Sequence, residues 1–151
     1  MRALIQRVSY GSVFIEKENY FAEINKGMVI LLGIKETDDE SDAEFVADKC
    51  SNLRIFEDEN EKMNLSLKDI NGEVLVISQF TLYGDTRRGN RPSFTDAARP
   101  EKAIPLYEKF IEKMKINLGE DKIKTGIFGA MMLVKIFNDG PVTVIVESKE
   151  R

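Results

Sequence analysis

The spacing of apolar residues divides the chain into short strands and two amphipathic helices. The run from Met28 to Ile34 has no polar alternation, which is typical of a strand buried on both faces. Asn25-Lys26-Gly27 just before it is a turn signal. Apolar runs of strand length predict strands over 2–10, 12–17, 21–24, 28–34, 53–57, 73–82, 123–137 and 142–147.

Helical spacing occurs in two places. Ser41 and Glu44 have the spacing of a capping box, and the apolar residues behind them predict a helix over 41–52. Pro100 suits the first turn of a second helix. The inner face of that helix is predicted to carry Ala103, Tyr107, Phe110, Ile111, Met114 and Leu118. This order of elements predicts an α+β fold, with two main helices packed on a largely antiparallel β-sheet or barrel.

Composition is that of a single globular domain, which we expect to cover residues 1–151. Hydrophobic residues make up 42% of the chain and charged residues 32%, and no repeat or Pro/Gly/Ser-rich linker divides it. No apolar run approaches the roughly 20 residues that a membrane helix needs. Residues 1–7 lack a signal-peptide core. We therefore expect a cytoplasmic protein with no membrane partner.

The absence of histidine is the strongest restriction on chemistry. It excludes Ser-His-Asp and Cys-His nucleophile activation, and zinc sites with histidine ligands. The single cysteine, Cys50, falls on the apolar face of the first predicted helix, which favours a buried, inert thiol. We expect neither a metal nor another cofactor, so catalysis has to use main-chain dipoles, other polar side chains or the substrate itself.

Charge is distributed unevenly along this acidic chain. Residues 36–61 hold 11 acidic and two basic side chains, whereas residues 83–124 hold 10 basic and 7 acidic ones. The predicted loop over 83–99 contributes Arg87, Arg88 and Arg91 to the basic region, together with Arg99. Such a region can meet a phosphate backbone. From charge alone, two solvated faces of opposite sign are the simpler interpretation.

Two motifs stand out from the scaffold. Ser78-Gln79-Phe80-Thr81 ends a buried strand, where polar residues often line a site, although their hydroxyls could also serve nearby backbone. Asn138-Asp139-Gly140-Pro141 reads as a hairpin turn because Asp-Gly separates two apolar runs. Proline is unfavourable at the start of a strand, however, because it cannot donate a hydrogen bond to the sheet. Gly140 would allow a ligand to approach the backbone closely. Sequence leaves the isomer of the Gly140-Pro141 bond open.

With these motifs the chain resembles bacterial D-aminoacyl-tRNA deacylases of the D-tyrosyl-tRNA deacylase type, essentially from end to end. Ser78 to Thr81 and the Gly140-Pro141 pair match the two signatures of that family. Further matches are Met1 to Val8, Asn52 to Phe56, Lys62 to Ser66, Arg91 to Phe94, Gly126 to Met132 and Val142-Thr143. Gly84 and Asn90 depart from the residues common in the family.

The resemblance implies hydrolysis of the ester between a D-amino acid, or mischarged glycine, and the 3′-terminal adenosine of tRNA. It also implies a homodimer in which a Gly-cisPro pair, here Gly140-Pro141, enters the active site of the other subunit. The opposite wall of that site would be Ser78, Gln79, Phe80 and Thr81. L-aminoacyl-tRNA would be rejected, which is proofreading of translation.

Roles within this site follow as hypotheses. Backbone N–H groups around Phe80 and Thr81 are expected to stabilise the oxyanion, with support from the Gln79 amide. Thr81 could be a nucleophile, but no general base is identifiable, which favours a positioning hydroxyl. Met132 or Met131 could line the pocket or only fill the core.

Arg87, Arg88 and Arg91 are the candidates for tRNA backbone contacts. The alternative function is a non-catalytic module, built on the same barrel, that binds RNA or adenosine. Such a module would keep the basic loop but would not need the Gly-Pro pair. A purely structural oligomer would explain neither motif.

Overall fold

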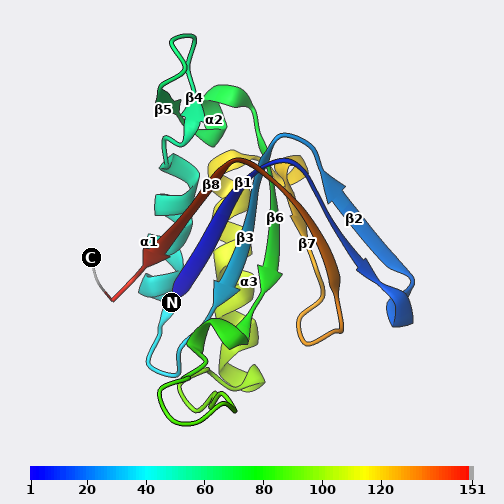
Figure 1. Ribbon diagram of the computed structural model, residues 1–151, viewed down its shortest axis with the longest axis vertical. Coiled ribbons are helices and arrows are strands. Elements are labelled where there is room, and N and C mark those ends of the chain that lie inside the picture. The colour runs from blue at the N-terminus through cyan, green and yellow to red at the C-terminus, as the bar shows by residue number, and fades with distance from the viewer. Residues whose placement is uncertain (150–151) are drawn as a thin grey trace.

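A computed structural model describes residues 1–149 and confirms the α+β fold (Figure 1). The last two residues of the predicted domain lie outside the described part. The strands are β1 (Arg2–Ile15), β2 (Tyr20–Ile24), β3 (Gly27–Gly33), β4 (Phe56–Glu57), β5 (Met63–Leu65), β6 (Glu73–Ser78), β7 (Ile123–Thr125) and β8 (Leu133–Glu147). The α-helices are α1 (Glu40–Asn52), α2 (Leu67–Ile70) and α3 (Pro100–Leu118), and the 3₁₀ turns are η1 (Glu16–Glu18), η2 (Phe80–Tyr83) and η3 (Glu120–Lys122).

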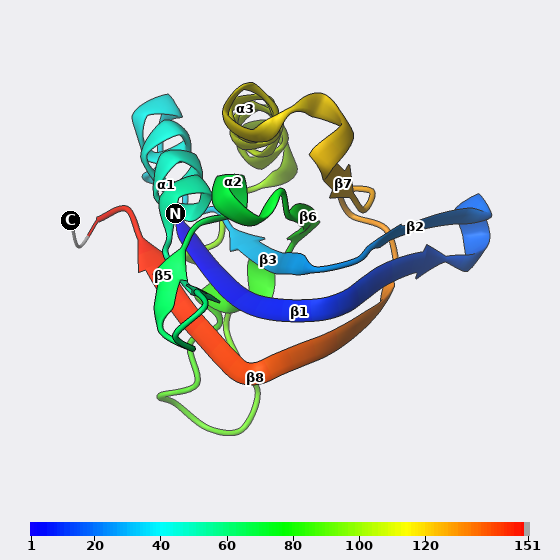
Figure 2. The same ribbon diagram turned by 90° about the horizontal axis from the view of Figure 1, so that it is seen from above.

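The main sheet is mixed and is organised around the long strand β1. Strand β1 pairs antiparallel with β2, β3 and β8, whereas β6 pairs parallel with β3 and with β7. Helices α1 and α3, the two main helices expected, lie side by side on one face of β3 and β6, and β8 lies on the far side of β1 (Figure 2). The small β4–β5 hairpin projects from one end.

Both faces of the central strands are buried, as the unbroken apolar run predicts. On β3, Met28, Ile30 and Leu32 pack into the core beneath the helices. Val29, between them, belongs to a second core on the opposite face, which is covered by residues from the 127–136 segment. Alternate side chains of one strand therefore stabilise two separate layers.

Helix α1 is capped differently from the prediction. The Ser41–Glu44 capping box is wrong, because the helix begins at Glu40 and Asp39 is its N-cap. The Asp39 carboxylate accepts the Asp42 N–H at 3.2 Å, and the Asp42 carboxylate accepts the Asp39 N–H at 2.8 Å. Ser41 instead donates its hydroxyl to Asp39 at 2.6 Å. A carboxylate two residues earlier satisfies the first N–H groups equally well.

Cys50 lies in the core, as the helical pattern predicts. Its side chain has no exposed surface, and desolvation by burial raises the pKa of the thiol far above its usual range. Thiolate formation is therefore disfavoured at this position.

Strand boundaries differ from the prediction at Gly11 and after Thr125. The two strands predicted on either side of Gly11 form one continuous strand. A Cβ at Gly11 would lie 2.8 Å from Val29 Cγ2, so glycine allows close packing at this position and does not end the strand. The strand predicted over 123–137 is interrupted between β7 and β8. The hairpin turn expected at 138–141 is absent, because β8 continues through it.

The remaining differences from the prediction concern short segments. Only Phe56–Glu57 of the strand predicted over 53–57 is extended, and the strand predicted over 73–82 ends at Ser78, where η2 follows. Strand β5 and the short helix α2 were not predicted. Within residues 1–149, no helix is long and apolar enough to span a membrane.

Candidate functional site

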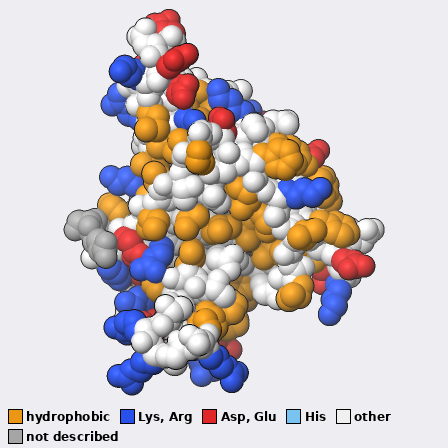
Figure 3. Space-filling view, in the orientation of Figure 1, with side chains coloured by type: hydrophobic (Ala, Val, Ile, Leu, Met, Phe, Trp, Pro, Cys, Tyr) orange, Lys and Arg blue, Asp and Glu red, His pale blue; other side chains and the backbone are white. Residues whose placement is uncertain are grey.

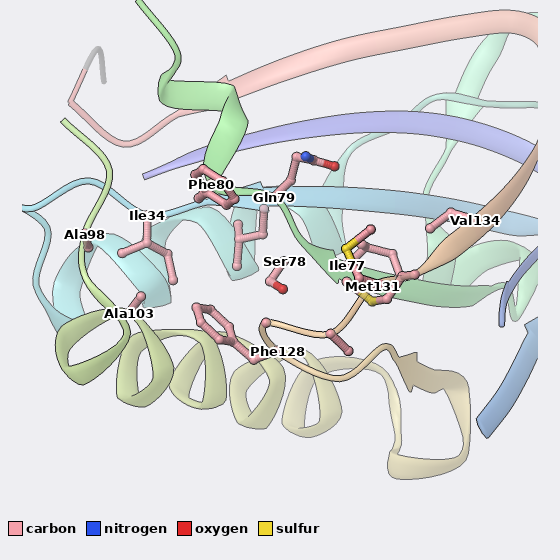
Figure 4. A pocket seen from close by; sticks show the side chains of 14 residues that line it. Ile34, Ile77, Ser78, Gln79, Phe80, Ala98, Ala103, Phe128, Met131 and Val134 are labelled. Carbon is pink, nitrogen blue, oxygen red and sulfur yellow. The ribbon is translucent and has the colours of Figure 1, made fainter. Parts of the chain in front are cut away.

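A pocket of about 310 Å³ opens where strand β6 ends (Figure 4). Four parts of the chain meet there: the end of β3, the end of β6 with η2, the segment that leads into the start of β8, and the region around the start of α3. The walls are mainly apolar. The lining residues are Leu32, Ile34, Ile77, Ser78, Gln79, Phe80, Ala98, Ala103, Phe128, Gly129, Ala130, Met131, Met132 and Val134.

None of these lining residues has an ionisable side chain. The polar groups on the walls are therefore backbone amides, the Ser78 hydroxyl and the Gln79 amide. Among the described residues, no group of three or more acidic or cysteine side chains is arranged to hold a metal ion. The pocket can bind and polarise a substrate, but it offers no general acid or base of its own.

The end of β6 is held rigidly against β3. The Gln79 N–H donates to the Leu32 carbonyl at 2.8 Å, which keeps the chain in the sheet as η2 begins. A Cβ at Gly33 would lie 3.1 Å from Leu82 Cβ and 3.2 Å from the Gln79 carbonyl oxygen, so glycine allows η2 to pack closely on β3. The backbone of η2 thus presents a fixed surface beside the pocket.

Three of the four residues of the first motif line this pocket. The Ser78 side chain points toward its middle, and Phe80 lies at its rim with 56% of its side chain exposed (Figure 4). Thr81 is exposed and does not line the pocket, and the Gln79 amide donates a hydrogen bond to its hydroxyl. The geometry therefore groups Ser78, Gln79 and Phe80, with Thr81 tied to them through Gln79.

Met132 and Met131 both line the pocket opposite β6. A Cβ at Gly126 would lie only 2.5 Å from Met132 Sδ, so glycine at this position lets the Met132 side chain reach its place. This loop had been predicted as part of a strand. Its apolar residues line a pocket instead of extending the sheet.

The second motif forms a bulge on β8, defined here as residues 139–142. Gln6 is opposite Thr143 and Val8 is opposite Asn138. The four bulge residues of β8 therefore lie opposite the single residue Arg7 of β1. The Gly140-Pro141 bond is cis, and both residues are exposed. Gly140 has φ +120°, a conformation that favours glycine.

The Arg7 side chain, only 7% exposed, anchors this bulge. It donates to the Asp139 carbonyl at 3.2 Å and to the Ile55 carbonyl at 2.8 Å. Asn138 closes the base of the bulge by donating to the Arg7 and Val142 carbonyls, each at 3.0 Å. The bulge is therefore held by specific hydrogen bonds.

The two motifs do not share a pocket within one chain. No residue of the bulge lines the pocket at the end of β6. Gly140 instead borders a cavity of about 190 Å³ on another part of the molecule, together with Arg7, Lys26, Phe56, Glu57 and Asp139.

The three arginines of the predicted tRNA-binding group lie on an exposed loop whose base is closed by paired hydrogen bonds between Asp85 and Ser93. Lys and Arg side chains gather at that end of the molecule (Figure 3). Arg87 is bidentate on Asp85, at 2.7 and 2.8 Å, and lowers the pKa of that carboxyl to about 2. Within the described residues, Arg88 and Arg91 form no such pair.

Sequence reasoning did not single out Arg7 or Phe128. The signal for Arg7 was present, since alternation in β1 places it on the same face as the buried Ala3 and Ile5. A charged residue at such a position indicates a specific partner. No comparable signal marks Phe128, which lies in the loop taken for a strand.

Comparison with known proteins gives a consistent result. A family model described as D-Tyr-tRNA(Tyr) deacylase matches residues 4–147. A D-aminoacyl-tRNA deacylase of Flavobacterium psychrophilum is 53% identical over 151 residues, covering 100% of this chain and 99% of the relative. One from Clostridioides difficile is 54% identical over 153 residues and covers 99% of both chains.

Solved structures agree with the fold. A protein described as "c-Myc DNA Unwinding Element Binding Protein" superposes with a TM-score of 0.90 at 40% identity, covering 97% of this chain and 98% of its own. A probable eukaryotic D-amino acid tRNA deacylase superposes with a TM-score of 0.83 over 96% of this chain and 97% of its own. At 14% identity, that second likeness shows the fold alone.

Proposed function

This chain belongs to the D-Tyr-tRNA(Tyr) deacylase family and acts as a D-aminoacyl-tRNA deacylase, and from that premise we propose how it selects and cleaves its substrate. The aminoacylated 3′-terminal adenosine enters the pocket at the end of β6. The main-chain carbonyls of Gly140 and Pro141, here called the carbonyl wall, face this pocket from a second copy of the chain. We expect the enzyme to work in the cytoplasm on charged tRNA.

A second copy is supported by an exposed apolar face on the sheet. Phe14 of β1 is opposite Phe21 of β2 and Leu133 of β8, and these side chains are 42%, 55% and 63% exposed. Contiguous apolar side chains of this size on a soluble domain mark an interaction surface. Pairing through this side of the sheet would form a homodimer with two shared sites.

Hydrolysis requires stabilisation of a tetrahedral oxyanion more than a strong nucleophile. An aminoacyl ester is already reactive, and its ammonium group and neighbouring ribose hydroxyl activate it further. Phe80 and Thr81 begin the 3₁₀ turn η2, so their N–H groups have no carbonyl partner inside that turn. Donors of this kind each contribute about 3–4 kcal/mol when aimed at an oxyanion.

The attacking group in this proposal is a water, which the substrate's own 2′-hydroxyl helps to place. Ser78 and the Gln79 amide position it, while Gln79 also holds the Thr81 hydroxyl. Thr81 itself orients the turn and forms no covalent intermediate, because no base lies in the pocket to activate it. The ester bond to the ribose breaks, releasing the free amino acid and intact tRNA.

Selection by handedness follows from the carbonyl wall. Peptide oxygens attract the α-ammonium group and occupy the space that an L side chain would need, so that L-aminoacyl esters are excluded sterically. A D side chain points toward solvent, so the enzyme does not distinguish one D-amino acid from another by its side chain. Glycine carries hydrogen at both positions, so mischarged glycyl-tRNA is also cleaved.

The observation that carries the proposal is the uncharged pocket at the end of β6 in a chain of this family. The test is to follow ester loss from D-tyrosyl-, L-tyrosyl- and glycyl-tRNA. We expect D-tyrosyl- and glycyl-tRNA to be hydrolysed and L-tyrosyl-tRNA to survive. Equal loss of both tyrosyl isomers would contradict the selectivity, and stable glycyl-tRNA at high enzyme concentration would contradict the carbonyl wall.

A further inference from the structure

Two exposed aromatic side chains, one on the pocket lining and one in contact with it, have no role in the reaction proposed above. Phe80 lines the pocket and is 56% exposed, and Phe94, from the arginine loop, is 37% exposed. Their ring centroids lie 5.1 Å apart at an interplanar angle of 73°, which is an edge-to-face arrangement. This geometry leaves part of each ring available to another planar group.

Local hydrogen bonds fix Phe94 at the base of the loop. Asp85 and Ser93 exchange two backbone hydrogen bonds, at 2.7 and 3.0 Å, and Phe94 follows directly. The Phe94 carbonyl accepts the Ala97 N–H at 3.2 Å. The ring therefore stands between the pocket rim and the loop tip that carries the arginines.

Gly84 provides the space for this ring. A Cβ at position 84 would lie 2.9 Å from Phe94 Cε1 and 3.0 Å from the Thr81 carbonyl oxygen. Any side chain there would press on both the ring and η2. The contact between the arginine loop and the pocket rim thus depends on glycine at this position.

We propose that Phe80 and Phe94 form a stacking platform for the penultimate nucleotide of the bound tRNA, the one that precedes the terminal adenosine. The inference rests on the proposed function, because it needs the terminal adenosine in the pocket. A single-stranded 3′ end that leaves the pocket toward Arg88 and Arg91 then passes over the two rings. Unpaired bases are bound in this way, by stacking on aromatic side chains with phosphates near basic residues.

The platform predicts a difference between substrates of different length. D-tyrosyl-adenosine ends at the pocket, whereas D-tyrosyl-cytidylyl-adenosine adds the nucleotide that would stack. The added nucleotide should lower KM in the wild-type chain by about tenfold, which is the range for one stacked base. Phe94→Leu keeps an apolar contact with Phe80 but has no ring, and it should abolish this advantage.

Three controls accompany the comparison. Phe94→Tyr keeps the ring and should retain most of the advantage. Ile116→Ala, at an exposed apolar residue of α3 away from the pocket lining, should leave the ratio of the two KM values unaltered. A dinucleotide ester whose penultimate ribose lacks its base tests the wild-type chain directly, so the outcome does not depend on the folding of any variant.

The experiment measures KM for the three esters with each protein. We expect the advantage of the dinucleotide to vanish both in Phe94→Leu and when the base is removed. An abasic ester that binds as well as the complete one, or a Phe94→Leu change that weakens both esters equally, would overturn the platform. Failure of the wild-type chain to cleave any of these D-esters would instead overturn the proposed function, and the platform with it.

Discussion

The pocket at the end of β6 and the bulge on β8 both lie where regular strand structure stops, and in our proposal they supply opposite poles of the backbone. The pocket is lined by uncharged side chains and lies beside the free N–H groups that begin η2. The bulge is exposed, is bordered by charged side chains, and is held by Arg7 at the Asp139 carbonyl. N–H groups suit a developing oxyanion, whereas carbonyl oxygens suit an ammonium group.

This difference suggests why one chain would be insufficient for a chiral site. An aminoacyl ester carries an ammonium group next to the carbonyl that becomes an oxyanion. Backbone carbonyl oxygens and backbone N–H groups are therefore both needed close to the same ester. A single chain keeps its pocket and its bulge in separate cavities. Pairing of two chains, as proposed above, would bring the poles together.

The largest effect is expected when the bulge loses its anchor. Arg7→Ala removes the donors to the Asp139 and Ile55 carbonyls, so the carbonyl wall should lose its position. We expect kcat/KM for D-tyrosyl-tRNA to fall by about 100-fold or more, and the free energy of unfolding by about 1–3 kcal/mol. Kinetics and urea titration measure the two effects.

Lys26→Ala is the matched control, since Lys26 is exposed and borders the same cavity but has no side-chain bond to the bulge. It should change kcat/KM by less than about threefold, as is usual for a surface side chain. A fully active Arg7→Ala enzyme would show that the bulge needs no anchor.

A smaller effect is expected in the pocket. Gly126→Ala places a methyl group against Met132 Sδ, and this flexible side chain, which lines the pocket, has to move. We expect KM to rise by about tenfold, because a small displacement of a lining group spoils substrate placement. Combining it with Met132→Ala removes the collision and should recover part of the affinity. An unchanged KM in the single variant would argue against a role for Met132.

The basic loop should contribute modestly and in a salt-dependent way. Arg88→Gln and Arg91→Gln should each raise KM for charged tRNA several-fold and reduce its dependence on salt concentration by about one unit of log–log slope. Arg87→Gln should do less, because that guanidinium already pairs with Asp85. KM measured between low and physiological salt tests this order, and equal effects at all three positions would contradict it.

The smallest effect is expected at Thr81. Thr81→Val removes an exposed hydroxyl that receives a hydrogen bond from Gln79, and it should lower the single-turnover rate by less than about tenfold. Rapid-quench measurement with saturating enzyme separates chemistry from binding. Loss of most of the rate with intact binding would make Thr81 the nucleophile.

What could be predicted from sequence depended on whether the deciding contacts were local. The apolar run of β3 and the helical stripe of α3 carry their own periodicity, so both elements were predicted closely. The exit of a buried strand at Ser78 also located the pocket. The cap of α1 was misplaced because Asp39 competes with Ser41 over a two-residue distance that pattern alone does not resolve.

The bulge could not be distinguished from a hairpin in the sequence. Asp-Gly favours a turn locally, and the outcome is decided by Arg7 and Asn138, more than 130 residues apart. The loop before β8 was missed for a related reason. Phe128 and Met132 are apolar like strand residues and pack against the two cores, but they do so from a loop that also lines the pocket.

Mixing two defective chains tests the shared site most directly. One chain carries Arg7→Ala, which spoils the bulge, and the other carries Ala130→Phe, which fills the pocket. In a mixed dimer one site would combine the intact pocket of the first chain with the intact bulge of the second. Random pairing at equal amounts should then restore about a quarter of the wild-type rate on D-tyrosyl-tRNA. A mixture no more active than its two parents would contradict the account.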